Sequence, residues 1–124
     1  MSHISKIELK INDLDALKRA CDRLGLQFLH WQSCFKWFSG TMKCDHAIKV
    51  PDASYEIGVV RKDKDYDLLW DDWSSGGLVQ RLGPGAGLLK QAYTIERVRA
   101  EARKKNMRFT ETQREEGIRL VLTS

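Results

Sequence analysis

The sequence predicts an α+β fold in which a single antiparallel sheet carries two helices on one of its faces. Several runs alternate apolar and polar residues with the period of a half-buried strand, and two longer runs place apolar residues at helical steps of three and four. The expected order of elements is β-α-β-β-β-β-α-β-β. With 124 residues, 42% of them hydrophobic and 31% charged, the chain is expected to form a single domain spanning residues 1–124.

The first strand and helix follow from local patterns. Residues 4–11 alternate between apolar and mainly charged side chains, which predicts a strand. Asn12 or Asp13 can then cap a short helix, and Gly25 can adopt the left-handed conformation that ends it. The apolar stripe of this helix consists of Leu14, Leu17, Cys21 and Leu24.

Strands are expected to fill the middle of the chain. Residues 26–38 mix aromatic and polar side chains at strand spacing, which predicts one long strand with room for a bulge. Further strands are expected at residues 44–50, 55–59 and 66–70. Short polar turns make these strands antiparallel neighbours, as in a meander. Residues 71–87 are rich in glycine and should be irregular, with one short helical turn at residues 78–82.

The longest helical pattern covers residues 88–106. Its apolar stripe consists of Leu88, Ala92, Ile95, Val98 and Ala102. Residues 83–108 include seven basic residues and two glutamates, a net charge of +5, whereas the whole chain carries +4. A terminal hairpin should follow, with strands at residues 109–113 and 118–122. The inward-facing residues of its second strand should be Ile118, Leu120 and Leu122.

The concentration of positive charge predicts a site for an anionic partner on the long helix. The residues of this site are Arg97, Arg103, Lys104, Lys105 and Arg108. Such cations can contact phosphates, and exposed aromatic rings beside them would suit a single-stranded nucleic acid. A solvated helix face explains the same residues, because cations are stabilised near the C-terminal end of a helix dipole. Both interpretations are open at the level of the sequence.

A second candidate surface lies at the glycine-rich start of the long helix. Backbone N–H groups near Gly85 and Gly87, assisted by Lys90, could bind an anion. The segment lacks the Gly-Lys-Ser/Thr ending of a phosphate-binding loop and the spacing of a dinucleotide-binding loop. A flexible connector is therefore the simpler interpretation.

The same surface is expected to include Trp70, Asp71 and Trp73, from the unusual tetrapeptide Trp-Asp-Asp-Trp. Adjacent residues of a strand point to opposite faces, so the two carboxylates should not converge on a metal or act as an acid and base pair. The simpler interpretation places Trp70 in the core and Trp73 at its edge. An exposed Trp31, Trp37 or Trp73 would instead indicate a surface for stacking or for a partner.

The cysteines predict reduced thiols. Their number is three, so they cannot all pair within the chain, which favours a cytoplasmic setting. Cys34, Cys44 and His46 are the only group that resembles a metal site, but no motif places the fourth ligand that structural zinc requires. We therefore expect buried thiols, a surface histidine, no metal and no other cofactor.

Four segments of the sequence resemble a known family. They are MSHISKIELKINDLDALKRACDRLG, YEIGVV, LLKQAYTIERVRAEARKKN and EEGIRLVL. Over nearly the whole chain they resemble the uncharacterised family typified by hypothetical chloroplast reading frame 35 (domain of unknown function 1257), in its bacterial and phage forms. The family carries no established activity, so the resemblance implies a grouping and little chemistry. The chain departs from plastid-type members at CDHAIKV and GGLVQRLGPGAG, which puts in doubt any role assigned there by analogy.

The favoured function is that of a non-catalytic binding module. Its expected partner is a protein, contacted through the basic helix and an aromatic-edged surface, and the phage distribution of the family implies a modulator or inhibitor of a host machine. The first alternative is the binding of nucleic acid at the basic face. The second is the binding of an anionic small molecule, such as a nucleotide, at the glycine-rich helix start. An enzyme is least favoured, because no nucleophile has an identifiable base.

The sequence also bears on location. No run approaches the roughly 20 apolar residues that span a bilayer, so we expect no membrane association and a cytoplasmic location. Whether the chain forms a homo-oligomer is open.

Overall fold

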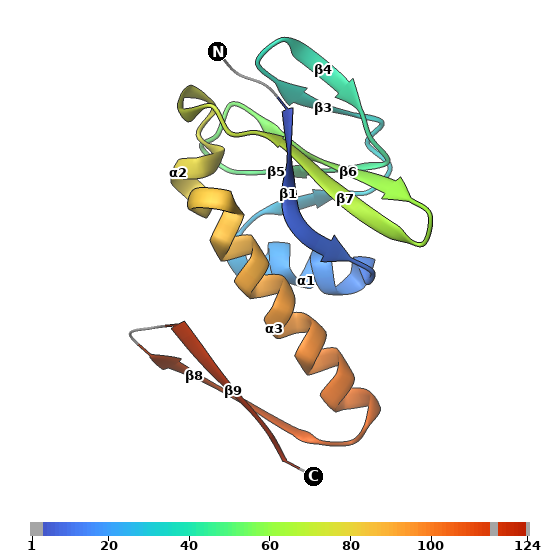
Figure 1. Ribbon diagram of the computed structural model, residues 1–124, viewed down its shortest axis with the longest axis vertical. Helices are drawn as coiled ribbons and strands as arrows, with labels where there is room; N and C mark the ends of the chain where they lie inside the picture. Colours follow the sequence, from blue (N-terminus) through green and yellow to red (C-terminus); the bar gives the residue numbers. More distant parts are fainter. Residues whose placement is uncertain (1–3, 115–116, 124) are drawn as a thin grey trace.

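The computed structural model describes residues 4–114 and 117–123 and confirms the α+β class. Its main sheet has five antiparallel strands in the order β1-β7-β6-β5-β2 (Figure 1). These strands are β1 (Ile4–Ile11), β2 (Gln27–Leu29), β5 (His46–Lys49), β6 (Glu56–Lys62) and β7 (Asp65–Asp71). Two separate hairpins consist of β3 (Cys34–Trp37) with β4 (Gly40–Lys43), and of β8 (Arg108–Arg114) with β9 (Gly117–Thr123). The helices are α1 (Leu14–Leu24), α2 (Leu78–Leu82) and α3 (Gly87–Lys104), with 3₁₀ turns η1 (Ser74–Gly76) and η2 (Pro84–Ala86) before α2 and α3.

Local signals in the sequence set the ends of α1. The Asp13 side chain accepts a hydrogen bond from the backbone N–H of Ala16 at 3.0 Å, as an N-cap does. Gly25 follows the last helical residue with a φ of 73°, the left-handed conformation that ends a helix. Both predicted caps are confirmed.

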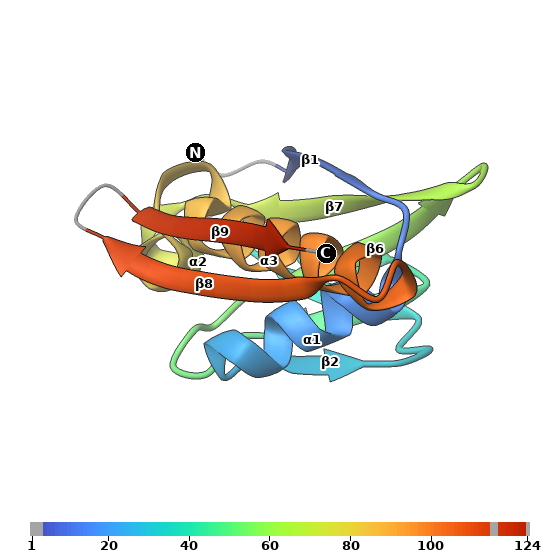
Figure 2. The same cartoon turned by 90° about the horizontal axis from the view of Figure 1, so that it is seen from below.

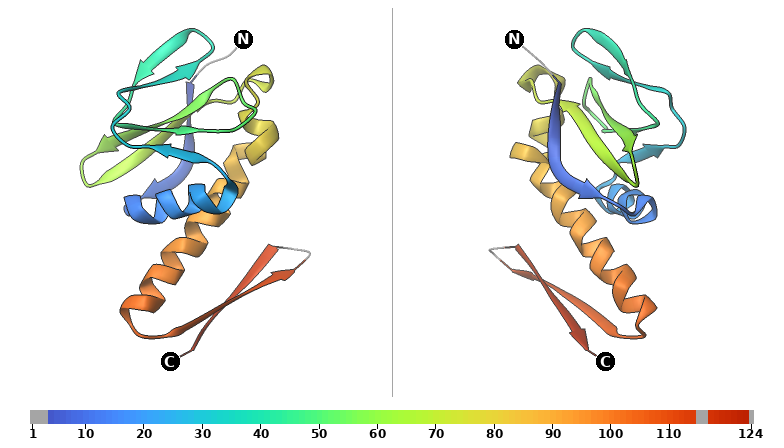
Figure 3. Two further views of the ribbon diagram at one scale, coloured as in Figure 1. Left: turned by 180° about the vertical axis from the view of Figure 1, so that it is seen from behind. Right: turned by 45° about the vertical axis from the view of Figure 1, so that its right-hand side comes forward.

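The helices pack on one face of the main sheet and form the core with it (Figures 1 and 3). The sheet contributes Ile7, Ile11, Ile48, Ile57, Val59, Leu68 and Trp70 to this core. The helices contribute Ala16, Leu17, Ala20, Cys21, Leu78, Leu82, Leu89, Ala92 and Tyr93. The alternation of apolar residues along β1, β6 and β7 therefore marks the face toward the helices, as predicted.

The β3–β4 hairpin covers the opposite face of the sheet. Ile57 and Val59 point toward the helices, so Gly58 between them points to the other side. There the ring of the fully buried Phe35 lies against the backbone of Gly58, and a Cβ atom at this position would be 2.4 Å from the ring. The glycine is required for this close approach of two strands.

The prediction of one long strand at residues 26–38 is wrong, because the chain divides there into β2 and β3. Trp31 lies between them with a φ of 61°, a left-handed conformation that is uncommon for a residue other than glycine. β2 stays at the edge of the main sheet beside β5, whereas β3 crosses to the face where Phe35 is buried. Both parts keep the spacing of a strand, so the pattern continues across the break. The sequence also does not predict β4.

The terminal hairpin is not a member of the main sheet, which corrects the expectation of a single sheet (Figure 2). It leads on from α3, whose predicted apolar stripe also needs correction. Leu88 is 45% exposed, and Leu89 and Tyr93 enter the core instead. Ile95 and Ala102 are buried but lie outside the main core cluster. The buried surface of α3 is therefore wider than the single stripe that the sequence predicts.

Candidate functional site

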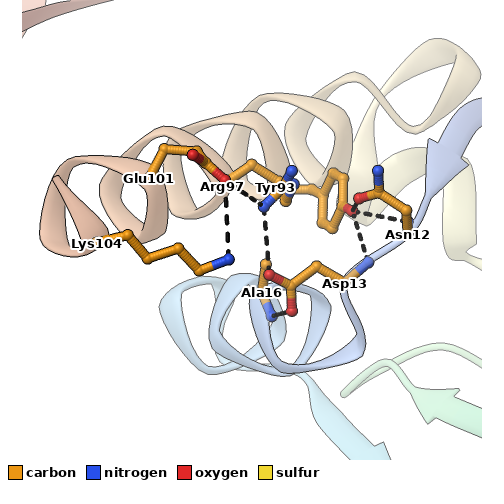
Figure 4. Close-up of polar contacts among 7 residues, drawn as sticks. All are labelled: Asn12, Asp13, Ala16, Tyr93, Arg97, Glu101 and Lys104. Atoms are coloured by element: carbon orange, nitrogen blue, oxygen red, sulfur yellow. Dashed lines mark hydrogen bonds and ion pairs between the residues drawn. The ribbon is translucent and has the colours of Figure 1, made fainter.

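A polar network joins the start of α1 to the middle of α3 (Figure 4). The Tyr93 hydroxyl accepts hydrogen bonds from the backbone N–H groups of Asn12 at 3.1 Å and Asp13 at 3.3 Å, and donates one to Asn12 Oδ1 at 3.2 Å. Burial raises the pKa of Tyr93, so the hydroxyl keeps its proton at neutral pH. Tyr93 therefore holds the two helices together by satisfying backbone groups before α1.

Arg97 belongs to this network and is not free for a partner. Its Nη1 atom lies 3.4 Å from Asp13 Oδ2 and 3.8 Å from Glu101 Oε1. Lys104 lies about one turn after Glu101 and is a more distant partner of the same carboxylate, with its Nζ atom 4.0 Å from Glu101 Oε1. Arg97 is one of the residues predicted to bind an anionic partner, but its charge is shared between two carboxylates of the chain itself.

A second ion cluster connects the terminal hairpin to both long helices. Glu96, buried on α3, lies 3.3 Å from Arg23 Nη1 and 3.8 Å from Arg99 Nη1. Glu111 on β8 forms ion pairs with the same two arginines, at 3.6 Å for Arg99 Nη2, and the hydrogen bond from Arg23 lowers the pKa of Glu111. Arg99 also lies 5.5 Å from the centroid of the Phe109 ring. This cluster links residues far apart in sequence, so no local sequence pattern predicts it.

Three of the five residues predicted to bind an anionic partner lie at or just after the C-terminal end of α3 and have no ion pair among the described residues. Arg103, Lys105 and Arg108 are exposed and form no ion pair within residues 4–114 and 117–123. We call these three residues the cation cluster. A neighbouring groove of about 290 Å³ is lined by Arg19, Arg103 and Lys104, but also by acidic residues of the first helical turn. The positive charge available to a partner therefore covers a smaller area than the predicted basic face. It centres on the C-terminal end of α3.

One buried carboxylate holds the backbone at two exposed aromatic residues. Asp71, at the end of β7, is fully buried. Its Oδ1 accepts a hydrogen bond from the backbone N–H of Trp73 at 3.0 Å, and its Oδ2 accepts one from the backbone N–H of Phe38 at 3.2 Å. The Phe38 residue is 62% exposed and Trp73 is 40% exposed. We call Phe38 and Trp73 the aromatic surface.

The other residue predicted for this surface, Trp70, lies elsewhere. It is only 3% exposed and belongs to the core. It lines a groove of about 370 Å³ that also includes Gly85 and Lys90, so the structure brings these three predicted residues together. It does not bring Gly87, Asp71 or Trp73 into the lining of that groove.

The groove beside Gly85 has a mixed charge. The Lys90 Nζ atom comes within 3.5 Å of the point where a Cβ atom on Gly85 would lie. Glu8 and Asp72 line the same groove, opposite in charge to Lys6 and Lys90. Carboxylates disfavour the approach of an anion, so this geometry gives little support to an anion site.

Two of the three residues that resemble a metal site, Cys44 and His46, are engaged in other bonds. The Cys44 thiol donates to the backbone carbonyl of Gln32 at 3.1 Å, and burial raises the pKa of Cys44 to about 11. A protonated thiol is a poor metal ligand. His46 Nδ1 accepts a hydrogen bond from the backbone N–H of Trp31 at 3.0 Å. Within the described residues, no three His, Cys, Asp or Glu side chains are grouped to hold a metal ion.

His46 corrects the expectation of a surface histidine, because it is 1% exposed. Its ring centroid lies 4.6 Å from that of Trp31, 5.4 Å from that of His30 and 5.5 Å from that of Phe28. Burial and the neighbouring His30 lower the pKa of His46. The sequence signal for this burial is the face that His46 shares with Ile48.

The chain was compared with models of protein families, with curated proteins and with solved structures, and no match was found. Among the described residues, no helix has the length and apolar composition needed to cross a membrane.

Proposed function

We propose that the chain is a non-catalytic module that binds a protein partner, and that the aromatic surface is the anchor of the contact. The observation that carries this proposal is the buried Asp71, which fixes the backbone at both Phe38 and Trp73. Aromatic side chains supply much of the binding energy in protein interfaces, especially when they are held in place before binding. Both carboxylate oxygens of Asp71 are occupied by backbone N–H groups, which supports a positioning role and not a role in acid-base chemistry.

The charge beside the aromatic surface favours a protein over a nucleic acid at this place. Asp72, next to Trp73, is exposed and acidic, and it would repel phosphate groups. The resemblance to the chloroplast reading frame 35 family and its phage members is compatible with a modulator of a host machine. That role is part of the proposal, and so is a cytoplasmic location.

A second candidate function is the binding of an anionic partner, either nucleic acid or an acidic protein, at the cation cluster. The observation that favours it is the exposure of Arg103, Lys105 and Arg108 without ion pairs among the described residues. The cluster lies at the end of α3 far from the β3–β4 hairpin (Figure 1). One small partner would therefore not contact the cluster and Phe38 together.

The experiment that tests the main proposal is quantitative mass spectrometry of material co-purified from the native cell under native conditions. The variant Phe38→Ser with Trp73→Ser should lose a protein that the parent retains. The matched control is Trp31→Ser, since Trp31 is 77% exposed but lies outside the aromatic surface. Asp71→Asn should weaken the same contact, because the amide accepts fewer hydrogen bonds than the carboxylate.

The two candidates predict different outcomes in this experiment. If the partner depends on the cation cluster, the variant with Gln at Arg103, Lys105 and Arg108 will lose it and the double aromatic variant will keep it. For duplex DNA, the dependence of log affinity on log salt should flatten by about 0.9 for each phosphate contact removed. Retention of every co-purified protein by the double aromatic variant would contradict the aromatic anchor.

A further inference from the structure

The terminal hairpin has open strand edges within the described residues. β8 and β9 pair only with each other, in a continuous register from Arg108↔Thr123 to Arg114↔Gly117. Figure 2 shows β8 on the side of α1, where Glu111 binds Arg23, and β9 forms the other edge. A two-stranded sheet is only marginally stable by itself, because half of its backbone groups have no partner in the sheet.

The edge of β9 lacks the features that usually keep a strand edge unpaired. Exposed edges are commonly protected by proline, by several charged side chains or by a bulge. β9 has the sequence Gly-Ile-Arg-Leu-Val-Leu-Thr, with Arg119 as its one charge, and its register with β8 has no irregularity. Leu122, which should face inward, is 42% exposed. The composition of β9 is therefore that of a strand with a pairing partner along each of its two edges.

The register also indicates which amides of β9 point outward. Arg114 and Gly117 face each other at the closed end of the hairpin, and a closing pair of this kind exchanges its backbone hydrogen bonds across the hairpin. Every second residue from Gly117 onward then directs its N–H and C=O groups toward β8. The residues between them direct these groups outward. The residues whose backbone N–H and C=O groups point outward are Ile118, Leu120 and Leu122.

We propose that the edge of β9 pairs with β9 of a second copy of the chain, antiparallel and about a two-fold axis at Leu120. Leu120 is the middle residue of the strand, so this register pairs β9 over its full length and places outward amides opposite outward amides. Ile118 faces Leu122 of the second copy. Arg119 faces Val121, so the two positive charges do not meet. A register centred on Arg119 would place the two arginines opposite each other, and one centred on Val121 would pair a shorter part of the strand. A register centred between two residues would place outward amides opposite inward ones.

A second copy fits this edge better than an unrelated strand because the register is self-complementary. Each strand gives and receives the same set of hydrogen bonds, as a two-fold interface requires. The two hairpins become one four-stranded sheet, which exceeds the number of strands needed for independent stability. The exposed Leu122 also gains Ile118 of the second copy as its cross-strand neighbour.

The first test is the molar mass in solution, measured by light scattering across a range of protein concentrations. The full chain should approach twice 14.3 kDa as concentration rises. Leu120→Pro removes an outward N–H and should weaken dimerisation by roughly tenfold or more, because each copy loses one intermolecular hydrogen bond. Leu120→Ala keeps that N–H and is the matched control, which should still dimerise.

The second test remains decisive if circular dichroism shows that Leu120→Pro unfolds the hairpin. In a background with Ser at Cys34 and Cys44, Leu120→Cys should form an interchain disulfide, since facing residues of a hydrogen-bonded pair lie about 5.5 Å apart between Cα atoms. Val121→Cys should cross-link far less, because Val121 faces Arg119 and not itself. A 14.3 kDa species at every concentration would overturn the proposal. So would a dimer that persists in a folded Leu120→Pro variant, or equal cross-linking at both positions.

Discussion

Arg23 of α1 and Glu111 of β8 are 88 residues apart in the sequence and form an ion pair that attaches the terminal hairpin to the first helix. Arg99 of α3 contacts the same glutamate, and the buried Glu96 lies beside both arginines. The hairpin is thus connected to the two long helices through charges, whereas the main sheet is connected to them through an apolar core. The two attachments should respond differently to mutation and to pH.

Glu111→Gln should loosen the hairpin and leave the main sheet unchanged. A partly exposed ion pair contributes at most about 1 kcal/mol, so amide hydrogen exchange in β8 and β9 should accelerate by up to roughly fivefold. Because Arg23 lowers the pKa of Glu111, the contribution is complete above the ordinary value of 4.5 and is lost as pH falls through the lowered value. Protection of the parent hairpin should decline in that acidic window. Equal acceleration in the main sheet would show that the ion pair is not a local attachment.

Gly58→Ala should destabilise the protein, because its Cβ atom would lie 2.4 Å from the Phe35 ring. Overpacking of this kind costs about 1–3 kcal/mol, measurable by denaturant unfolding. Adding Phe35→Leu should recover part of the loss. Gly87→Ala is the control, since that glycine has a helical φ of −54° and no neighbour within 4 Å of a Cβ atom. A Gly58 variant as stable as the parent would mean that β3 is not packed on β6 as described.

His46 should make the protein less stable below neutral pH. Its folded-state pKa lies below the ordinary value of 6.5, because burial and His30 disfavour the charged ring. The unfolded chain therefore takes up a proton more readily, and the free energy of unfolding should fall as pH drops below 6.5, down to the folded-state pKa. His46→Gln should remove this part of the pH dependence, as measured by denaturant unfolding at several pH values. An unchanged pH profile in the variant would assign the effect to another group.

Arg97 and Arg103 should differ in their effect on stability. Arg97→Gln removes the contact with Asp13 and Glu101, and should lower the free energy of unfolding by about 0.5–1 kcal/mol. Arg103→Gln should leave it unchanged, because Arg103 is exposed and has no ion pair among the described residues. Thermal unfolding of the two variants at equal ionic strength measures the difference. A comparable loss in both would indicate that the cation cluster is also structural.

The parts of the fold that the sequence predicts correctly depend on neighbouring residues. Asp13 and Gly25 cap α1 through their own backbone and side-chain geometry, so their positions can be identified locally. The division of residues 26–38 at Trp31 cannot be predicted in this way. It results from the burial of Phe35 against Gly58, a contact between strands that the alternating pattern does not encode.

The candidate sites are likewise predictable only where they depend on residues close together in the sequence. The sequence identifies Asp71 and Trp73 as unusual, and it excludes convergence of adjacent carboxylates. It cannot supply the link to Phe38, which comes from another hairpin. Likewise, helical spacing places Arg97 on a basic face, but only the position of α1 reveals that Asp13 shares its charge. The charge available to a partner depends on these tertiary ion pairs more than on the total charge.

The shared carboxylate of Asp71 makes the two aromatic residues thermodynamically dependent on each other. A contact that draws Trp73 away from Asp71 changes the free energy with which the same carboxylate holds Phe38. Coupling of this kind is reciprocal, so ordering either residue favours the ordering of the other by an equal free energy. Because both hydrogen bonds come from backbone N–H groups, side-chain changes at Phe38 or Trp73 keep them, and Asp71→Ala is the change that should release both segments together.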